Sequence, residues 1–245
     1  MDFDKKSGDF SLMGPEAWIA LSEGLWTLEA PIPTLPFKRR MTVFRLKDRS
    51  LAIHSCIALT EEGFAKLESF GTPSVLIIPN RLHDLDARYY KNRYPDLRVL
   101  TPALSMKDVE KVITPTGDYE QFPVDHTTRV ETLDGSQGGE GAFVHQADNE
   151  ISLVFNDTLF NVPPIRGPKG WLMRLLGSTG GPRVTPLARW TLVSDKHRLA
   201  NHLWHLSQLP GLKRIIPGHG DVIETDAAQT LEAVARKLGK VAPIG

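Results

Sequence analysis

The sequence is poor in cysteine and has no long hydrophobic run. Its single cysteine, Cys56, excludes an internal disulfide, and the apolar residues around it favour a buried, inert thiol over a nucleophile. No stretch approaches 18 consecutive apolar residues, so we expect no membrane span. The first residues, MDFDKKSGDFSL, are polar and acidic where a secretory signal is basic and then apolar. These features predict a cytoplasmic protein.

A surplus of positive charge is also missing. Lys plus Arg and Asp plus Glu number 29 each, so the chain of 245 residues is neutral. Because binding to a nucleic-acid backbone relies on clustered positive charge, we expect no nucleic-acid partner. The sequence shows no internal repeat and no low-complexity linker. We therefore predict a single domain over residues 23–245, preceded by a loosely ordered leader over residues 1–22 with a short helix over residues 16–21.

Apolar runs and turn residues predict two similar series of strands and helices. The first has strands over residues 25–30, 41–46, 51–54, 75–78 and 97–100, with helices over residues 61–70 and up to about residue 94. The second has strands over residues 129–133, 141–145, 151–155 and from residue 212, with helices over residues 195–206 and 227–238. Because hairpins precede the helices, this order predicts an α/β fold of two packed mixed sheets with helices outside, a four-layer αββα sandwich.

Two of the predicted strands end in side chains that bind metals. The apolar run ISLVFN is followed at once by Asp157, and the run that begins at residue 212 ends in a Pro-Gly turn that delivers His219 between two glycines. Asp157 alone is explained as well by a cap on the next turn. Two strand ends that each carry a metal-ligand side chain make a site hypothesis, because ligands bind at such ends in α/β sheets.

Residues 25–238 resemble the metallo-β-lactamase-fold hydrolases in the order and spacing of their elements. The sequences FNDTLF around Asp157 and IIPGHG around His219 are similar to that family's sequences at a metal-bridging aspartate and at the last metal-binding histidine. In that family a motif written HxHxDH follows the strand that corresponds to residues 75–78, and Asp84 matches its aspartate. The resemblance implies a hydrolase that uses bound metal.

The sequence departs from the family pattern at four histidine positions, which hold Asn80, Leu82, Leu85 and Gly138. It looks closest to a branch of the fold that reads Pro-Asn-x-x-His after that strand and His-Ser near the second strand, here residues 79–83 and 54–55. A catalytic zinc takes three protein ligands plus water, and a two-metal centre needs about twice as many. The remaining residues therefore predict a reduced site for one divalent metal ion: zinc, iron or manganese.

The predicted metal ligands are His83, Asp157 and His219. His83 is displaced by one residue from the second histidine of the motif. If the next helix begins after His83, a changed turn can bring it to the site. If the helix includes it, the side chain turns about 100° away from its neighbour's direction, and His83 then only caps or hydrogen-bonds locally.

Three further residues complete the predicted site. Asp84 is the candidate catalytic residue, which would orient the attacking water or take its proton. His54, at the end of the strand over residues 51–54, and Asn80 are candidates for hydrogen bonding to a metal ligand. His54 is explained equally well as a satisfied buried histidine.

Residues 163–186 are predicted to form a flap. This segment is rich in Gly and Pro and encloses the apolar stretch WLMRLL at residues 171–176. Flanking glycines can act as hinges, so the flap would close over a pocket, lie in a dimer interface or touch a membrane surface. A helical turn packed on the body of the protein is the simpler alternative.

Two other groups of charged or metal-binding residues receive structural interpretations. His202 and His205 share a face of the helix over residues 195–206, but the leucines between them favour a boundary helix over a metal site. The triplet Lys38-Arg39-Arg40 is interpreted as solvated surface.

Two functions fit the sequence. In the first, a single metal ion activates water to attack a small ester, thioester, lactone or phosphoester. In the second, the protein is a pseudoenzyme that has lost the metal and binds a small molecule or a protein partner in the same pocket. Asp157 and His219 favour the first function, and the four replaced histidines favour the second. We expect a small-molecule substrate or ligand, and we favour the enzyme.

Overall fold

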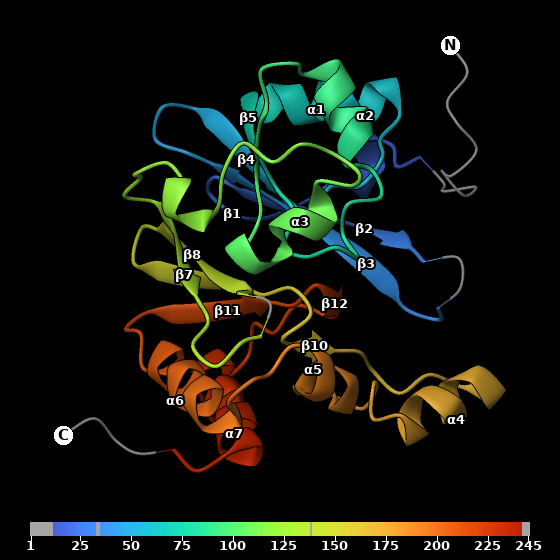
Figure 1. Cartoon of the computed structure of the whole chain (residues 1–245), viewed down its shortest axis with the longest axis vertical. Coiled ribbons are helices and arrows are strands. Elements are labelled where there is room, and N and C mark those ends of the chain that lie inside the picture. The colour runs from blue at the N-terminus through green and yellow to red at the C-terminus, as the bar shows by residue number, and fades with distance from the viewer. Residues whose placement is uncertain (1–11, 33–34, 138, 242–245) are drawn as a thin grey trace. The chain divides into compact units, whose positions relative to one another are not determined.

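The structure is a computed structural model that describes residues 12–32, 35–137 and 139–241. The described residues form two compact units: an N-terminal unit that ends at Thr127 and a C-terminal unit that begins at Thr128 (Figure 1). Each unit has its own hydrophobic core. The single domain over residues 23–245 stays a prediction.

The N-terminal unit is built on a six-stranded mixed sheet with the order β1-β2-β3-β4-β5-β6. Neighbours from β1 to β4 are antiparallel, and β4, β5 and β6 are parallel. The predicted hairpin is confirmed as the pair β3 and β4. The strands are β1 (Ile19–Ser22), β2 (Leu25–Pro31), β3 (Lys38–Arg45), β4 (Ser50–His54), β5 (Thr72–Ile77) and β6 (Arg98–Leu100).

Helices pack on one face of this sheet. In α1, the Thr60 hydroxyl accepts a hydrogen bond from the Gly63 amide at 3.1 Å, which caps the helix, and Phe64 and Leu67 enter the core. Tyr90 of α2 joins the same core. The helices are α1 (Glu61–Phe70), α2 (Ala87–Arg93) and α3 (Met106–Val109), with short 3-10 helices η1 (Pro15–Ala17), η2 (Ala103–Ser105) and η3 (Tyr119–Gln121).

Residues 16–21 do not form the predicted short helix. A single 3-10 turn, η1, ends at Ala17, and β1 then pairs with β2. Gly24 has a φ of 70°, a conformation that suits the tight turn between these two strands. The edge of β2 therefore takes up the backbone hydrogen bonds of β1, and this pairing outweighs a weak local preference for helix. Residues 1–11 of the predicted leader lie outside the described residues.

The interpretation of the basic triplet as solvated surface is wrong for two of its residues. Arg39 and Arg40 are buried on β3, and their guanidinium groups contact the carboxylates of Asp86 and Glu29 at 2.5 Å each. Buried arginines need such partners, because an unpaired charge inside a protein is costly. The partners lie 47 and 11 residues away along the chain, so the local sequence does not reveal them.

The C-terminal unit is built on a four-stranded mixed sheet with the order β11-β9-β8-β7. The meander of β7, β8 and β9 is antiparallel, as predicted, and β11 runs parallel to β9. A second, two-stranded parallel sheet joins β10 and β12. The strands are β7 (Thr128–Thr132), β8 (Gly141–Ala147), β9 (Glu150–Val154), β10 (Phe160–Asn161), β11 (Leu212–Ile216) and β12 (His219–Gly220).

Two helices cover one face of the four-stranded sheet (Figure 1). Leu153 of β9 shares a core with Leu203 of α6 and Leu231 of α7. Asp195 caps α6, because its carboxylate accepts hydrogen bonds from the amides of His197 and Arg198. Two shorter helices lie in the Gly- and Pro-rich part of the chain. The helices of this unit are α4 (Gly167–Leu175), α5 (Pro186–Thr191), α6 (Lys196–Ser207) and α7 (Ala227–Leu238).

Candidate metal centre

Asp157 lies in the turn that follows β9. The backbone continues from the strand through Phe155, whose amide donates to the Ile216 carbonyl at 2.9 Å, and then turns at residues 156–158. Asp157 is buried, with 8% of the residue's surface exposed. The apolar strand therefore places a carboxylate at the end of the sheet.

The turn is held by Glu140, a fully buried carboxylate just before β8. One Glu140 oxygen accepts from the Asp157 amide at 3.2 Å, and the other accepts from the Thr158 amide at 2.8 Å and from the Thr158 hydroxyl at 2.5 Å. The Asn156 side-chain amide approaches the first oxygen at 3.4 Å. Hydrogen bonds to a charged acceptor are stronger than neutral ones, so Glu140 fixes the backbone that presents Asp157.

His219 follows β11, the strand next to β9. Pro217 and Gly218 turn the chain, and β12 then pairs with β10 so that His219 lies opposite Phe160, with ring centroids 4.8 Å apart. Glycine suits position 218, because a Cβ there would lie 3.0 Å from the Asn156 side-chain oxygen, which is a tight contact. Parallel neighbours thus carry Asp157 and His219 to the same end of the sheet.

The two side chains meet as the sequence predicts. His219 Nε2 lies 3.2 Å from Asp157 Oδ1, and both residues are buried. Two ligand atoms bound at about 2.0–2.1 Å to one tetrahedral ion lie about 3.3 Å apart. The observed separation therefore fits two ligands of one metal ion without rearrangement. It equally fits a direct hydrogen bond.

His83 lies on the loop between β5 and α2 in the N-terminal unit. Its Nδ1 is 2.7 Å from the Ser55 hydroxyl, and its amide donates to the Asn80 carbonyl at 3.1 Å. Ser55 has a φ of 56°, an uncommon conformation for a residue other than glycine, just after β4. Since α2 begins at Ala87, His83 precedes the helix, which is the arrangement that the sequence requires of a histidine ligand.

The architecture can be compared with solved structures. No model of a known protein family matches the sequence, and no curated protein matches it either. Solved metallo-β-lactamases match the structure. DIM-1 metallo-β-lactamase gives a TM-score of 0.61 at 11% identity, over 94% of this chain and 99% of the other. A metallo-β-lactamase from Pontibacter korlensis gives 0.59 at 11% identity, over 89% and 98%, and TMB-1 gives 0.60 at 13%, over 90% and 96%.

The chain has the metallo-β-lactamase fold. This result confirms the predicted α/β class with two mixed sheets and outer helices, the αββα sandwich. At 11–13% identity the likeness concerns the fold alone.

The loop after β5 carries three of the residues that stand at histidine positions of the metallo-β-lactamase motif. Leu82 and Leu85, two of these residues, are 67% and 50% exposed. Asn80 is buried, and its side-chain oxygen accepts from the Leu82 amide at 2.8 Å, so it shapes the loop that carries His83. Gly138 lies outside the described residues.

Asp84 and His54 are both buried in the N-terminal unit. Burial raises the pKa of the Asp84 carboxyl above its ordinary value, because desolvation disfavours the charged form. His54 is the last residue of β4, where it lies opposite Thr42 of β3 and Ile77 of β5. Asp86 directly precedes α2, but its side chain pairs with Arg39 and does not cap the helix.

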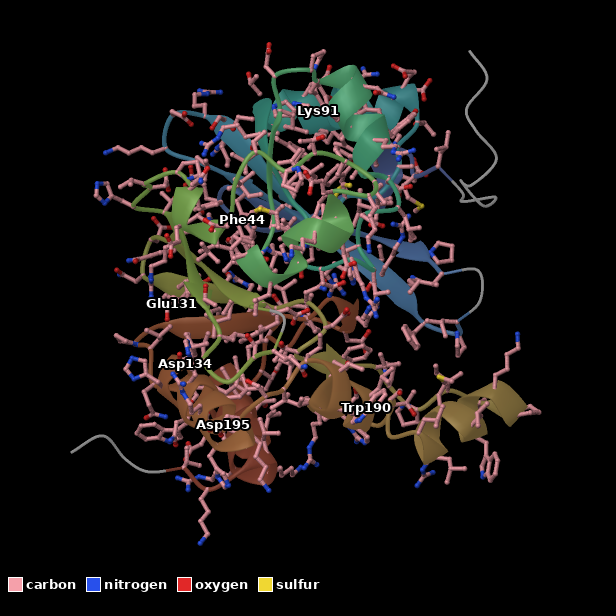
Figure 2. The ribbon with its side chains drawn as sticks, in the orientation of Figure 1. Phe44, Lys91, Glu131, Asp134, Trp190 and Asp195 are labelled. Atoms are coloured by element: carbon pink, nitrogen blue, oxygen red, sulfur yellow. The ribbon has the colours of Figure 1, made fainter. Side chains whose placement is uncertain are left out.

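Two further histidines, His145 and His202, have structural partners. His202 accepts from the Asp134 amide at 3.1 Å and lies 3.6 Å from Glu131, both labelled in Figure 2. His145 lies on β8 with its Nδ1 2.9 Å from the Thr128 hydroxyl. The interpretation of α6 as a boundary helix is consistent with these contacts.

Glu140 is the residue that sequence reasoning missed. Its signal was the register of the hairpin. In that register Phe143 faces Val154 and Ala147 faces Glu150, and its continuation places Glu140 opposite Asp157. A carboxylate beside a carboxylate is unfavourable unless donors separate the two, and here the backbone amides of the turn supply them.

Proposed function

We propose that the protein binds one divalent metal ion through His83, Asp157 and His219 and hydrolyses a small ester, thioester, lactone or phosphoester. The separation of 3.2 Å between Asp157 Oδ1 and His219 Nε2, at adjacent strand ends of a metallo-β-lactamase fold, is the observation that carries this proposal. Glu140 supports the proposal, because a turn that a buried carboxylate holds in place fixes the position of a ligand side chain.

The donor atoms suit such an ion. Two imidazole nitrogens and one carboxylate oxygen form a common catalytic zinc site, and the same set with open positions binds ferrous iron. A bound ion of this kind supplies Lewis-acid chemistry, which polarises a carbonyl or phosphoryl oxygen and lowers the pKa of water to about 7. Zinc, iron and manganese therefore all belong in the metal analysis.

Ser55, just after β4, and Asp84, on the loop after β5, have distinct tasks in this proposal. Ser55 engages His83 at Nδ1, which orients the ring and makes Nε2 the nitrogen for the metal. Asp84 takes the proton from the attacking water. Its raised pKa suits this task, because a more basic carboxylate is a better proton acceptor near neutral pH.

A pseudoenzyme is the second candidate. It is favoured by the loop after β5, where Leu82 and Leu85 are exposed and offer no metal ligand, while the Asn80 side chain accepts a backbone hydrogen bond. In this case Asp157 and His219 form a hydrogen-bonded pair, and the fold binds a small molecule or a protein partner. The two candidates differ in metal content.

Elemental analysis of protein purified without chelator tests the proposal. We expect about one equivalent of zinc, iron or manganese per chain, because three protein ligands suffice for a catalytic site. Hydrolysis of a panel of chromogenic esters, thioesters, lactones and phosphodiesters should stop when the metal is removed and return when it is restored. Protein with less than about a tenth of an equivalent that also takes up none of these ions contradicts the hydrolase and favours the pseudoenzyme.

Replacing Ser55 by alanine tests the role of His83. The change removes the hydroxyl that holds Nδ1, so we expect metal affinity to fall about tenfold to a hundredfold while the protein stays folded. Ser74→Ala is the matched control, because the Ser74 hydroxyl donates to the Leu51 carbonyl in the same unit and contacts no histidine. Competition with a chromogenic chelator measures both affinities. Equal affinities for wild type and Ser55→Ala would remove His83 from the ligand set.

A further inference from the structure

Part of the chain between Asp157 and His219 has an unusual charge. From Thr158 to Ser194 the sequence contains no Asp and no Glu, although acidic and basic residues are equally numerous in the whole chain. The same segment contains the basic residues Arg166, Lys169, Arg174, Arg183 and Arg189. A purely cationic segment in a neutral protein is a local feature that favours an anionic partner.

The helix α4 in this segment exposes large apolar side chains. Trp171 and Leu175 are 67% and 69% exposed, and Leu172 and Leu176 are exposed as well. At 100° per residue, these four positions span an arc of about 140° on one side of the helix. Such a face would ordinarily be buried.

The opposite side of α4 contacts the residues that lead into the helix. Gly170 is buried there, and a Cβ at this position would lie 2.0 Å from the Ile165 carbonyl oxygen. The apolar face therefore lies on the side of α4 away from this contact. Figure 1 shows α4 standing apart from α6 and α7. Lys169 and Arg174, both exposed, flank the apolar arc on either side.

The next helix along the chain, α5, also exposes apolar and basic side chains. Leu187 and Trp190 are 63% and 81% exposed, and Arg189 between them is exposed too. Trp190 is labelled in Figure 2. A cavity of about 320 Å³ lies at this end of the segment. Arg183, Arg189 and Lys237 line it together with apolar side chains, and none of the described residues that line it is acidic. This hollow suits an anionic headgroup with an apolar tail beside it.

We propose that α4 and α5 form a surface that docks on anionic phospholipid bilayers. Amphipathic helices with Trp and Leu on one face and Lys or Arg at its borders lie in the interface of a bilayer, with the apolar face among the lipid chains and the cations at the phosphates. Among the residues that the structure describes, we find no helix that could span a bilayer. This proposal goes beyond the proposed hydrolase and uses none of its residues.

A second copy of the chain fits this surface less well. In a twofold symmetric contact the same patch meets itself, and here that would bring several arginines and lysines together without an acidic partner. Like charges across an interface are unfavourable. An anionic bilayer supplies the opposite charge and an apolar interior at once.

Sedimentation with vesicles tests the docking surface. Vesicles that contain phosphatidylglycerol should bind the protein at least about tenfold more tightly than pure phosphatidylcholine vesicles, and added salt should weaken the binding. Trp171→Gln/Leu175→Gln and Lys169→Glu/Arg174→Glu should each reduce binding at least about tenfold. Because the replaced side chains are exposed, the melting temperatures of both variants should match that of the wild type.

Matched variants in the N-terminal unit are the controls. Leu104 is 70% exposed, so Leu104→Gln removes an equally exposed leucine, and Lys47→Glu/Lys107→Glu changes the net charge as much as the α4 charge variant. Both controls should bind vesicles like the wild type.

Equal binding to the two vesicle types, or equal loss in controls and α4 variants, would overturn the proposal. A different result would also overturn it: the wild type binds no vesicles, forms dimers as its concentration rises, and loses these dimers in Trp171→Gln/Leu175→Gln. Metal content does not enter these measurements, so they stand apart from the hydrolase test.

Discussion

Replacing His219 by alanine is expected to lower the metal content from about one equivalent to less than about a tenth. The proposed site has three protein ligands, and two ligands fall below the number that catalytic zinc sites use. The fold should persist, because His219 lies in a strand of only two residues, outside the hydrophobic core of its unit. Its side chain contacts Asp157 and the Phe160 ring. Elemental analysis of the purified variant measures the loss.

Thermal unfolding gives a second readout of the same variant. A ligand that binds only the folded state stabilises it by about 2.7 kcal/mol at a hundred times its dissociation constant. A chelator should therefore lower the melting temperature of the wild type and leave that of His219→Ala unchanged. His202→Ala is the control, because His202 belongs to the same unit but contacts Asp134 and Glu131. Unchanged metal occupancy in His219→Ala would show that the ligands are misassigned.

The fold follows from local signals in the sequence. Short apolar runs ended by turn residues predict most strands to within a few residues, and the caps Thr60 and Asp195 mark the starts of α1 and α6. The pair Asp157 and His219 was predictable for the same reason. Each side chain follows an apolar strand directly, and parallel strands bring their ends together.

What the sequence did not reveal depends on partners that are distant along the chain. The strand β1 is stabilised by pairing with β2, and the buried Arg39 is stabilised by Asp86. Local patterns describe a residue's own preferences and not the partner that tertiary structure supplies. The basic triplet therefore looked like surface although two of its side chains are buried. The exposed face of α4 was visible only as an apolar stretch, because exposure depends on packing.

The role of Glu140 also depends on partners that are distant along the chain, and its replacement should have a large effect on stability. Glu140→Ala is expected to lower the free energy of unfolding by roughly 3–5 kcal/mol. The change leaves the Asp157 amide, the Thr158 amide and the Thr158 hydroxyl without their common acceptor in a fully buried place. Urea unfolding measures the loss. Glu131→Ala on the same sheet is the control, because Glu131 is partly exposed and its ion pairs contribute about 0–1 kcal/mol.

A variant that stays folded separates support of the turn from support of the metal. Glu140→Gln keeps the size of the side chain and one acceptor oxygen, but its NH2 group faces a backbone donor that the carboxylate accepted. We expect a smaller loss of stability than in Glu140→Ala. We also expect metal affinity about tenfold to a hundredfold lower, because the turn no longer fixes Asp157. If Glu140 supported only the fold, Glu140→Gln would be less stable than the wild type but would bind metal as tightly. That result would refute the role of Glu140 in positioning Asp157.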